Sequence, residues 1–479
     1  MTANQQAMEG NEQLEALMLE AGFLKRDDSV GLKKFARAVT ACHSKGKEFT
    51  HTYVRRWLNG TVPRKEVDRN AILTALSKQL GRRIRADEIG FESPKVDPDL
   101  GIHYPDTVSD GIASLRSLWR ADLAGSPDLL APSVRVAPWN DATLSWLVGM
   151  RHDVANGSGA KKVTAADVEA LTDMTDMYDR MDGQHGGGHA RRSLLEFLDT
   201  DVPRLIGGRY SSEVAPDLYR AVAQATLLGA WMSYDAGLHA VAQRYFIQAL
   251  GIAQAADDRL LGASILDAMS HQATFKHQYR EAANMARAAQ QAAAMSGSHL
   301  GMAHFAAMEA RALARLGDAV GCDRALSRAV REYERANFET DPAQWLRYFN
   351  ESELNAERSH CNRDLGRAAE AVVSATESLG PTSSGYIRSD FFVTMVLADA
   401  QLDQGDVDQA CATALEALEV GSSLKSARCG AYVGEFRERL EKVGQHSAVN
   451  DFVEQASAYK LWTPADSRRI STPGDSPLI

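Results

Sequence analysis

Apolar residues near the N-terminus recur at helical spacing in three successive segments. Each segment has one apolar face and one polar or charged face. The positions that we expect to be buried in these segments are Phe35, Ala36, Val39, Val54, Trp57, Val67, Ile72, Leu73, Leu76 and Leu80. Three short helices of this kind bury their apolar faces only against one another, so residues 11–92 are predicted to form a small all-helical domain.

The middle segment, residues 50–64, has the features of the recognition helix of a helix-turn-helix. Thr50 is expected to cap its start, Gly60 to end it and Pro63 to prevent its continuation. The apolar positions face the core, which leaves polar and basic side chains on the outward face. The residues that we expect to contact DNA are Lys47, Thr50, His51, Thr52, Tyr53, Arg55, Arg56, Arg64 and Lys65.

These residues divide by the part of the DNA that they suit. Base edges in the major groove are best read by polar side chains on the helix, and phosphates by long basic ones. We therefore expect His51, Thr52 and Arg55 at base edges. The residues expected at phosphates are Lys47, Arg56, Arg64 and Lys65.

Charge separates this domain from the rest of the chain. Residues 31–85 carry fourteen Lys and Arg side chains against three acidic ones, a net charge of +11, whereas residues 1–30 carry −4 and residues 86–479 carry −17. A basic window in an acidic protein attracts a polyanion to one place. Double-stranded DNA is therefore the expected partner; the alternative, an ordinary amphipathic surface helix, does not require this concentration of charge.

The region that follows, residues 93–217, is expected to connect two domains. Prolines and glycines predict a linker at its start. We predict helices at residues 109–123, 141–151 and 164–182, the last one capped by Thr164, and an extended or irregular segment at residues 131–139.

Three adjacent glycines stand directly before another helix in this region. A structural turn is the preferred interpretation, because glycine is needed where helices reverse tightly. Backbone amides and neighbouring arginines suit an anion instead, and a metal on His185 and His189 would lack further ligands nearby. The candidate anion site comprises Gly186, Gly187, Gly188, Arg191 and Arg192.

Residues 218–460 repeat with a period of about forty. In each of five units, two small residues stand twelve positions apart: Ala230 and Ala242, Ser270 and Ala282, Ala310 and Cys322, Ser359 and Ala371, and Ala398 and Ala410. A turn residue lies between them, namely Gly237, His277, Gly317, Gly366 and Gly405. These features resemble the tetratricopeptide repeat, which implies an α-solenoid of helical hairpins followed by a flexible tail at residues 461–479. A non-repetitive helical bundle is the alternative.

Composition and motifs exclude several classes of protein. No apolar run approaches the ~20 residues needed to span a bilayer, and the N-terminus lacks the features of a signal peptide, so we expect a cytoplasmic protein without a membrane partner. The five cysteines show no paired short spacing. No phosphate-binding loop or nucleophile motif is present, so neither an enzyme, a cofactor nor a metal is expected.

Taken together, several motifs resemble one family. They are Phe35-Ala-Arg-Ala-Val39, Trp57-Leu-Asn-Gly-Thr-Val-Pro-Arg64, His185-Gly-Gly-Gly-His-Ala-Arg191 and the C-terminal repeats. The chain resembles the NsdA-like regulators of differentiation and antibiotic production in streptomycete-type bacteria. This resemblance implies an all-α fold with an Xre-like helix-turn-helix, a helical linker region and a tetratricopeptide-like solenoid.

The function implied is that of a DNA-binding transcriptional regulator, a homodimeric repressor of developmental or secondary-metabolism genes. The solenoid would supply dimerisation and a groove for a peptide, small-molecule or protein effector. The residues expected in that groove are Lys276, Arg311, Arg347, Asn350, Asn355 and Arg358. The alternative is a protein–protein interaction adaptor whose helix-turn-helix no longer reads DNA.

Overall fold

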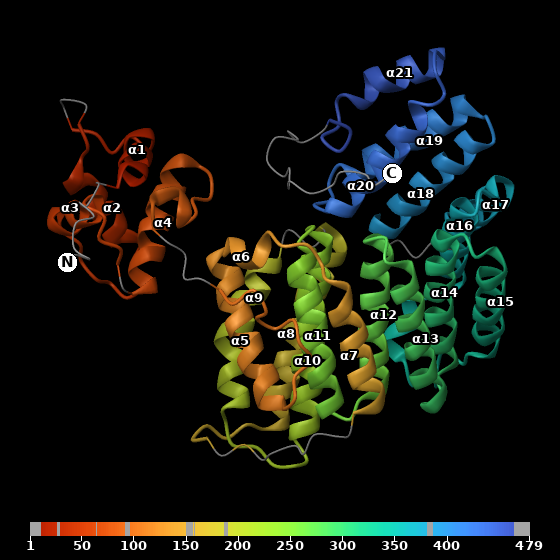
Figure 1. Cartoon of the computed structure of the whole chain (residues 1–479), viewed down its shortest axis with the longest axis horizontal. Helices are drawn as coiled ribbons and strands as arrows, with labels where there is room; N and C mark the ends of the chain where they lie inside the picture. The colour runs from red at the N-terminus through yellow and green to blue at the C-terminus, as the bar shows by residue number, and fades with distance from the viewer. Residues whose placement is uncertain are drawn as a thin grey trace, which may run out of the picture. The chain divides into compact units, whose positions relative to one another are not determined.

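The computed structural model describes residues 11–25, 29–63, 65–91, 96–149, 157, 159–185, 190–380 and 387–463. Within these ranges the chain is all-α, as predicted (Figure 1), and the β-type contacts are two isolated bridges, Leu24 with Val30 and Lys162 with Arg209. Across the same ranges, no helix combines the length and the apolar composition that a bilayer crossing requires. Most of the tail expected at 461–479 lies outside the described residues.

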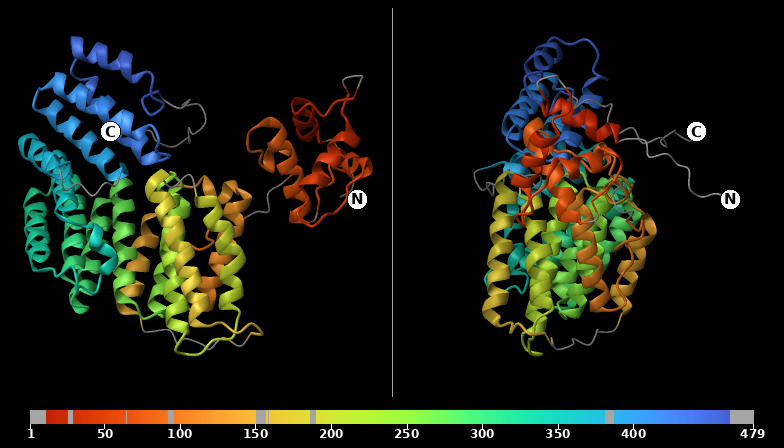
Figure 2. Two further views of the ribbon diagram at one scale, coloured as in Figure 1. Left: turned by 180° about the vertical axis from the view of Figure 1, so that it is seen from behind. Right: turned by 90° about the vertical axis from the view of Figure 1, so that its left-hand side faces the viewer.

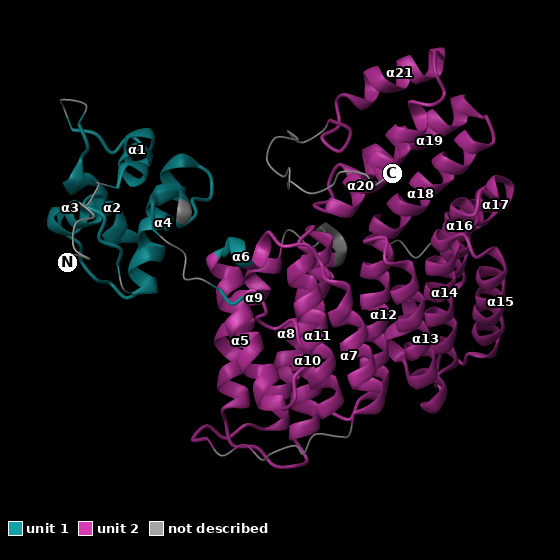
Figure 3. Ribbon diagram, viewed as in Figure 1, with its two compact units in different colours: residues 1–97, 125–128 teal, residues 98–124, 129–479 magenta. Residues whose placement is uncertain are grey.

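The chain divides into two compact units (Figure 3). Unit 1 comprises residues 1–97 and 125–128, and unit 2 comprises residues 98–124 and 129–479. The short helix α6 (Pro127–Leu130) lies at the boundary in sequence.

Unit 1 is a small helical domain built as the apolar pattern predicts. Its elements are α1 (Glu12–Glu20), α2 (Leu32–Cys42), α3 (His51–Leu58), α4 (Glu66–Leu80) and the 3-10 turn η1 (Asp87–Ile89). Phe35, Val54, Trp57 and Ile72 share one hydrophobic core. Glycines at positive φ end two of these helices: Gly60 follows α3 and Gly81 follows α4.

Unit 2 begins with four longer helices, α5 (Val108–Ala124), α7 (Val136–Val148), α8 (Ala165–His185) and α9 (Arg191–Ile206). At the start of α8, Asp167 forms its half of the expected capping box, since its carboxylate accepts the Thr164 backbone N–H at 2.9 Å and the Thr164 hydroxyl at 2.9 Å. The segment predicted to be extended or irregular, residues 131–139, is non-helical only as far as Arg135, since α7 begins at Val136. Pro138 is tolerated there because backbone N–H groups in the first helical turn have no intrahelical partner.

The rest of unit 2 is a series of antiparallel helical hairpins, whose helices stand beside one another in the left view of Figure 2. The first three are α10 (Ala215–Asp235) with α11 (His239–Ala255), α12 (Arg259–Phe275) with α13 (Tyr279–Met295), and α14 (His299–Leu316) with α15 (Ala319–Arg335). The next two are α16 (Glu351–Asp364) with α17 (Ala368–Ser378) and α18 (Ile387–Asp403) with α19 (Val407–Gly421). The last pair, α20 (Ala427–Leu440) and α21 (Ser447–Ala456), packs on the fifth hairpin, α20 against α18 and α21 against α19, and is called the sixth hairpin below.

The first five hairpins are those that the repeat pattern predicts. All ten paired small residues are fully buried at 0% exposure, where the two helices of each hairpin approach closely. In the second hairpin the contact is also polar, since the Ser270 hydroxyl donates to the Ala282 carbonyl at 2.8 Å. The sixth hairpin has no counterpart among the five predicted units.

Turn conformation and spacing follow from the same hairpin geometry. The four turn glycines have positive φ, and His277, at φ 61°, takes that conformation in the second hairpin. Left-handed backbone costs an L-residue free energy that glycine avoids. The longer spacing between the third and fourth units arises from an inserted segment that contains the 3-10 helix η2 (Gln344–Tyr348).

The helices of residues 98–217 pack into the hydrophobic core of the first three hairpins. Helices α5 and α7 contact α11, and α8 and α9 contact α10. In the structure, therefore, the region that we expected to connect two domains contributes helices to unit 2 from residue 98 onward.

Candidate nucleic-acid interface

Helix α3 and the segment that precedes it form the candidate DNA-reading element of unit 1. Helix α2 packs on both α3 and α4, and residues 43–50 connect α2 to α3. This connector, residues 43–50, is longer than the turn of many helix-turn-helix motifs, which has three to four residues. It therefore needs contacts of its own to place α3.

Two side chains of α2 and α4 provide these contacts. Phe49 donates its backbone N–H to the Thr40 hydroxyl at 2.9 Å. On the other side, the buried Asp68 carboxylate of α4 accepts from His43 at 3.1 Å and from Lys47 at 2.5 Å. Both ends of the connector are thus tied to the helices on which α3 packs.

Electrostatics favour the ionised form of Asp68. Burial by itself raises the pKa of this carboxyl, but the hydrogen bonds and charges of Lys47 and His43 outweigh burial, and the pKa is lowered overall. The carboxylate is therefore charged at neutral pH and holds two donors of the connector.

The outward face of α3 carries the side chains that the sequence predicts. His51, Thr52, Arg55 and Arg56 are exposed, whereas Val54 and Trp57 point into the core. Tyr53 is 38% exposed, because one side of its ring packs edge-on against Phe49 at 5.5 Å between centroids. The face that remains open to a partner is polar and positively charged.

Basic residues of unit 1 divide into those already paired and those directed outward. Lys47 bonds Asp68 and stacks over the ring of Phe49, so part of its charge is used within the domain. Arg82 likewise pairs with Glu88 at 2.7 Å. Within the described residues, by contrast, Arg55 and Arg56 pair with no carboxylate.

Three further DNA candidates stand next to α3 and α4 in sequence: Thr50, Arg64 and Lys65. Thr50 stands at the N-cap of α3, but its side chain makes no capping hydrogen bond, so the predicted hydroxyl cap is wrong. Its backbone is extended and its side chain is exposed. Lys65 is exposed at the N-cap of α4, and Arg64 lies outside the described residues.

Sequence reasoning missed three exposed basic residues near this face. Lys33 and Arg37 are on the outer side of α2, and Lys45 is on the connector. In the sequence, Lys33 and Arg37 stand between the apolar residues of α2, and this spacing could have indicated that they lie on its outer face. They extend the basic surface beyond α3.

The candidate anion site is largely outside the described residues, which exclude Gly186, Gly187 and Gly188. Its two arginines are engaged elsewhere. Arg191 forms a buried ion pair with Asp122 and donates to Ser233 at 2.8 Å. Arg192 pairs with Glu196 at 2.9 Å. Among the described residues, no group of His, Cys, Asp and Glu side chains is arranged to hold a metal.

The six residues expected in the repeat groove take several different roles. Arg311 is buried on α14 and pairs with Glu357 at 2.9 Å, and Arg347 donates to the Phe338 carbonyl. Asn350 caps α16, and Lys276 follows the last residue of α12. The structure joins only two of the six directly: Asn355 accepts from Arg358 at 2.8 Å. These two line an open depression of about 760 Å³ between α16 and α17.

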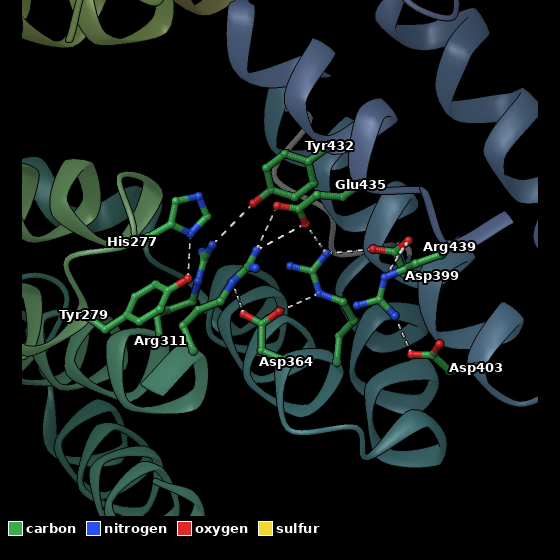
Figure 4. Close-up of polar contacts among 11 residues, drawn as sticks. His277, Tyr279, Arg311, Asp364, Asp399, Asp403, Tyr432, Glu435 and Arg439 are labelled. Carbon is green, nitrogen blue, oxygen red and sulfur yellow. Dashed lines mark hydrogen bonds and ion pairs between the residues drawn. The ribbon is translucent and has the colours of Figure 1, made fainter. Parts of the chain in front are cut away.

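A second set of polar residues, which the sequence did not single out, lies among the first helices of the hairpins (Figure 4). Arg315 pairs with Asp364 at 2.8 Å, Arg363 pairs with Asp399 at 2.7 Å, and both reach Glu435 of α20. In the sequence, Arg311 and Arg315 stand four residues apart on α14, and this spacing could have indicated that they share one face of the helix. We call these contacts the inner network.

Comparison with known families matches the N-terminal region. The family model of the SP15 N-terminal domain matches residues 14–92, a range that runs from α1 to just past η1. No curated protein matches the chain. Unit 1 is thus similar to SP15 N-terminal domains.

Proposed function

We propose that this protein is a DNA-binding transcriptional regulator that reads the major groove with α3. The observation that carries the proposal is the outward face of α3, where Arg55 and Arg56 are exposed without carboxylate partners among the described residues. Exposed arginines on a short rigid helix suit both base edges and phosphates.

Support for the reading geometry comes from the way α3 is held. The base of the helix is fixed by Val54 and Trp57 in the core, and the connector by Asp68. A rigid element presents its outward side chains in one register, which sequence-specific recognition requires. On this geometry His51, Thr52 and Arg55 would meet base edges, and Arg56 and Lys65 phosphates.

A single domain of this size contacts few base pairs, so we propose a homodimer that reads two half-sites about 34 Å apart or a multiple of that spacing. The helical repeats would supply the dimer contact and the surface for an effector. The resemblance to regulators of differentiation and antibiotic production favours a repressor.

Genome-wide mapping of bound DNA tests this proposal. Wild-type protein should occupy discrete sites, and an Arg55→Ala, Arg56→Ala double variant should lose them. Arg280→Ala is the matched control, because Arg280 is an exposed arginine on the repeat domain. Unchanged occupancy in the double variant would refute DNA reading by α3 and favour the adaptor.

A further inference from the structure

Helix α20 has two stripes of side chains that serve different partners. Cys429, Val433, Phe436 and Leu440 are buried in the hydrophobic core that α20 shares with α18, α19 and α21. A second stripe at the same spacing is polar and carries, in order, a base, a tyrosine, an acid and a base. This channel stripe comprises Arg428, Tyr432, Glu435 and Arg439.

The channel stripe contacts the first helices of earlier hairpins one after another. Arg428 pairs with Asp235 at the end of α10 at 2.8 Å. The Tyr432 hydroxyl accepts from Arg311 of α14 at 3.3 Å (Figure 4). Helix α20 therefore reaches hairpins that precede it by up to five units in sequence.

The start of α20 also lies directly against the turn of the first hairpin. Ser426, its N-cap, donates to Asp235 at 2.8 Å. A Cβ placed on Gly237 would lie 3.1 Å from the Cβ of Ala427. Because the first helices of successive hairpins pack in one row from α10 to α20, this contact joins the two ends of the row and closes it.

The closing contact is polar, whereas the hairpins on either side have separate apolar cores. The core of the fifth and sixth hairpins does not merge with that of the first four among the described residues. A small cluster, Ala356, Ala375 and Val393, lies between them on α16, α17 and α18. Separation at the closing contact thus exposes ion pairs rather than a continuous hydrophobic core.

Ion pairs of this kind resist separation weakly. Burying charges costs solvation that their mutual attraction only partly returns, and separating the surfaces restores water to both partners. The two arginines that α20 covers with Tyr432 and Glu435 are also incompletely satisfied, since Nε of Arg311 and Nη2 of Arg363 have no hydrogen-bond partner among the described residues. The closed and separated forms should therefore differ by a modest free energy.

We propose that the fifth and sixth hairpins form a clasp that opens from and closes on the first hairpin at Asp235, which pairs with Arg428 of α20 and with Arg388 of α18. In the closed form α20 covers Arg311, Arg315 and Arg363, which contact Tyr432 and Glu435. In the open form it exposes Asp235, Arg311, Arg315 and Arg363 as a surface that fits a helix with the charge order of the channel stripe. The clasp is independent of DNA binding and is tested without DNA.

Charge reversal at the closing pair tests the clasp. Arg428→Asp and Asp235→Arg should each speed amide hydrogen exchange by about tenfold in residues 231–238 and 426–440, and leave α12 to α15 unchanged. The double reversal should slow exchange again relative to either single variant, because it places opposite charges together at positions 428 and 235, but only in part, because Asp235 also pairs with Arg388 of α18 at 3.4 Å. Glu441→Lys, an exposed charge reversal at the end of α20, is the control.

A steric variant provides a second test that does not alter charge. Ala427 is exposed and faces Gly237, so Ala427→Trp should wedge the contact open, with the same exchange pattern and a larger radius of gyration in solution scattering. Unchanged exchange in both Arg428→Asp and Ala427→Trp would overturn the proposal. Faster exchange spread equally over α10 to α19 would also overturn it, because the contact would then belong to one cooperative core.

Discussion

His43 on the connector and Asp68 on α4 form a buried pair, with Nε2 of the ring 3.1 Å from Oδ1 of the carboxylate. The other ring nitrogen, Nδ1, accepts the backbone N–H of Lys47 at 3.0 Å. Because Nδ1 accepts, Nε2 is the ring nitrogen that donates to Asp68. One carboxylate thereby fixes the path of the chain between α2 and α3.

Replacing that carboxylate should loosen unit 1. Asp68→Asn keeps the size of the side chain but removes its charge, so His43 and Lys47 lose their charged acceptor. We expect the free energy of unfolding of unit 1 to fall by about 1–3 kcal/mol, measured by hydrogen exchange of amides in α2 to α4. Lys45→Met, on the exposed part of the same connector, is the control and should change it by less than about 0.5 kcal/mol.

The same carboxylate makes the stability of unit 1 depend on pH in the acid range. The pKa of Asp68 is lowered although burial alone raises it, because the hydrogen bonds and charges of Lys47 and His43 outweigh burial. Its stabilising contribution is complete above the ordinary aspartate pKa of about 3.9 and is lost as the pH falls through the lower folded value. Stability measured between about pH 6 and pH 2 should fall on acidification, and less steeply in Asp68→Asn. Equal slopes would contradict this assignment.

Arg55 and Arg56 should affect DNA binding differently. Arg55→Ala is expected to cost about 1–3 kcal/mol on the preferred site and to relax sequence preference at one position, as for a base contact. Arg56→Ala should weaken binding to all sequences and reduce the salt slope by about 1, as for a phosphate contact. Fluorescence anisotropy on specific and scrambled duplexes at several salt concentrations separates the two. Identical behaviour of the variants would remove the proposed division of roles.

Two glycine substitutions in the repeats should have opposite effects. Gly317 ends α14 at φ 80°, so Gly317→Ala forces a left-handed alanine and should destabilise unit 2 by about 1–2 kcal/mol. Gly430 lies inside α20 with open space where a Cβ would stand, so Gly430→Ala should stabilise the helix by about 0.5–1 kcal/mol. Thermal unfolding followed by circular dichroism measures both, and effects of the same sign would contradict the assignment.

Local patterns in the sequence determined the elements of both units. The spacing of Val54 and Trp57 predicted which face of α3 is buried, and the small-residue pairs predicted five hairpins, all with those residues fully buried. Such predictions succeed because helix faces and tight turns depend on neighbours a few positions apart. His277 is a further example, because the repeat period places it at the turn position that glycine occupies in the other four units, and it has the positive φ of that turn.

Only the tertiary structure decided which charged residues are used inside the molecule. A basic residue looks alike in sequence whether it faces a phosphate or a carboxylate far along the chain. The sequence therefore predicts ligand contacts for Lys47 and Arg311, whereas the structure pairs them with Asp68 and Glu357. The sixth hairpin and its contact with the first were likewise beyond the repeat pattern. Arg428 meets Asp235 across most of unit 2, and such a pairing depends on the curvature accumulated over all the hairpins between them.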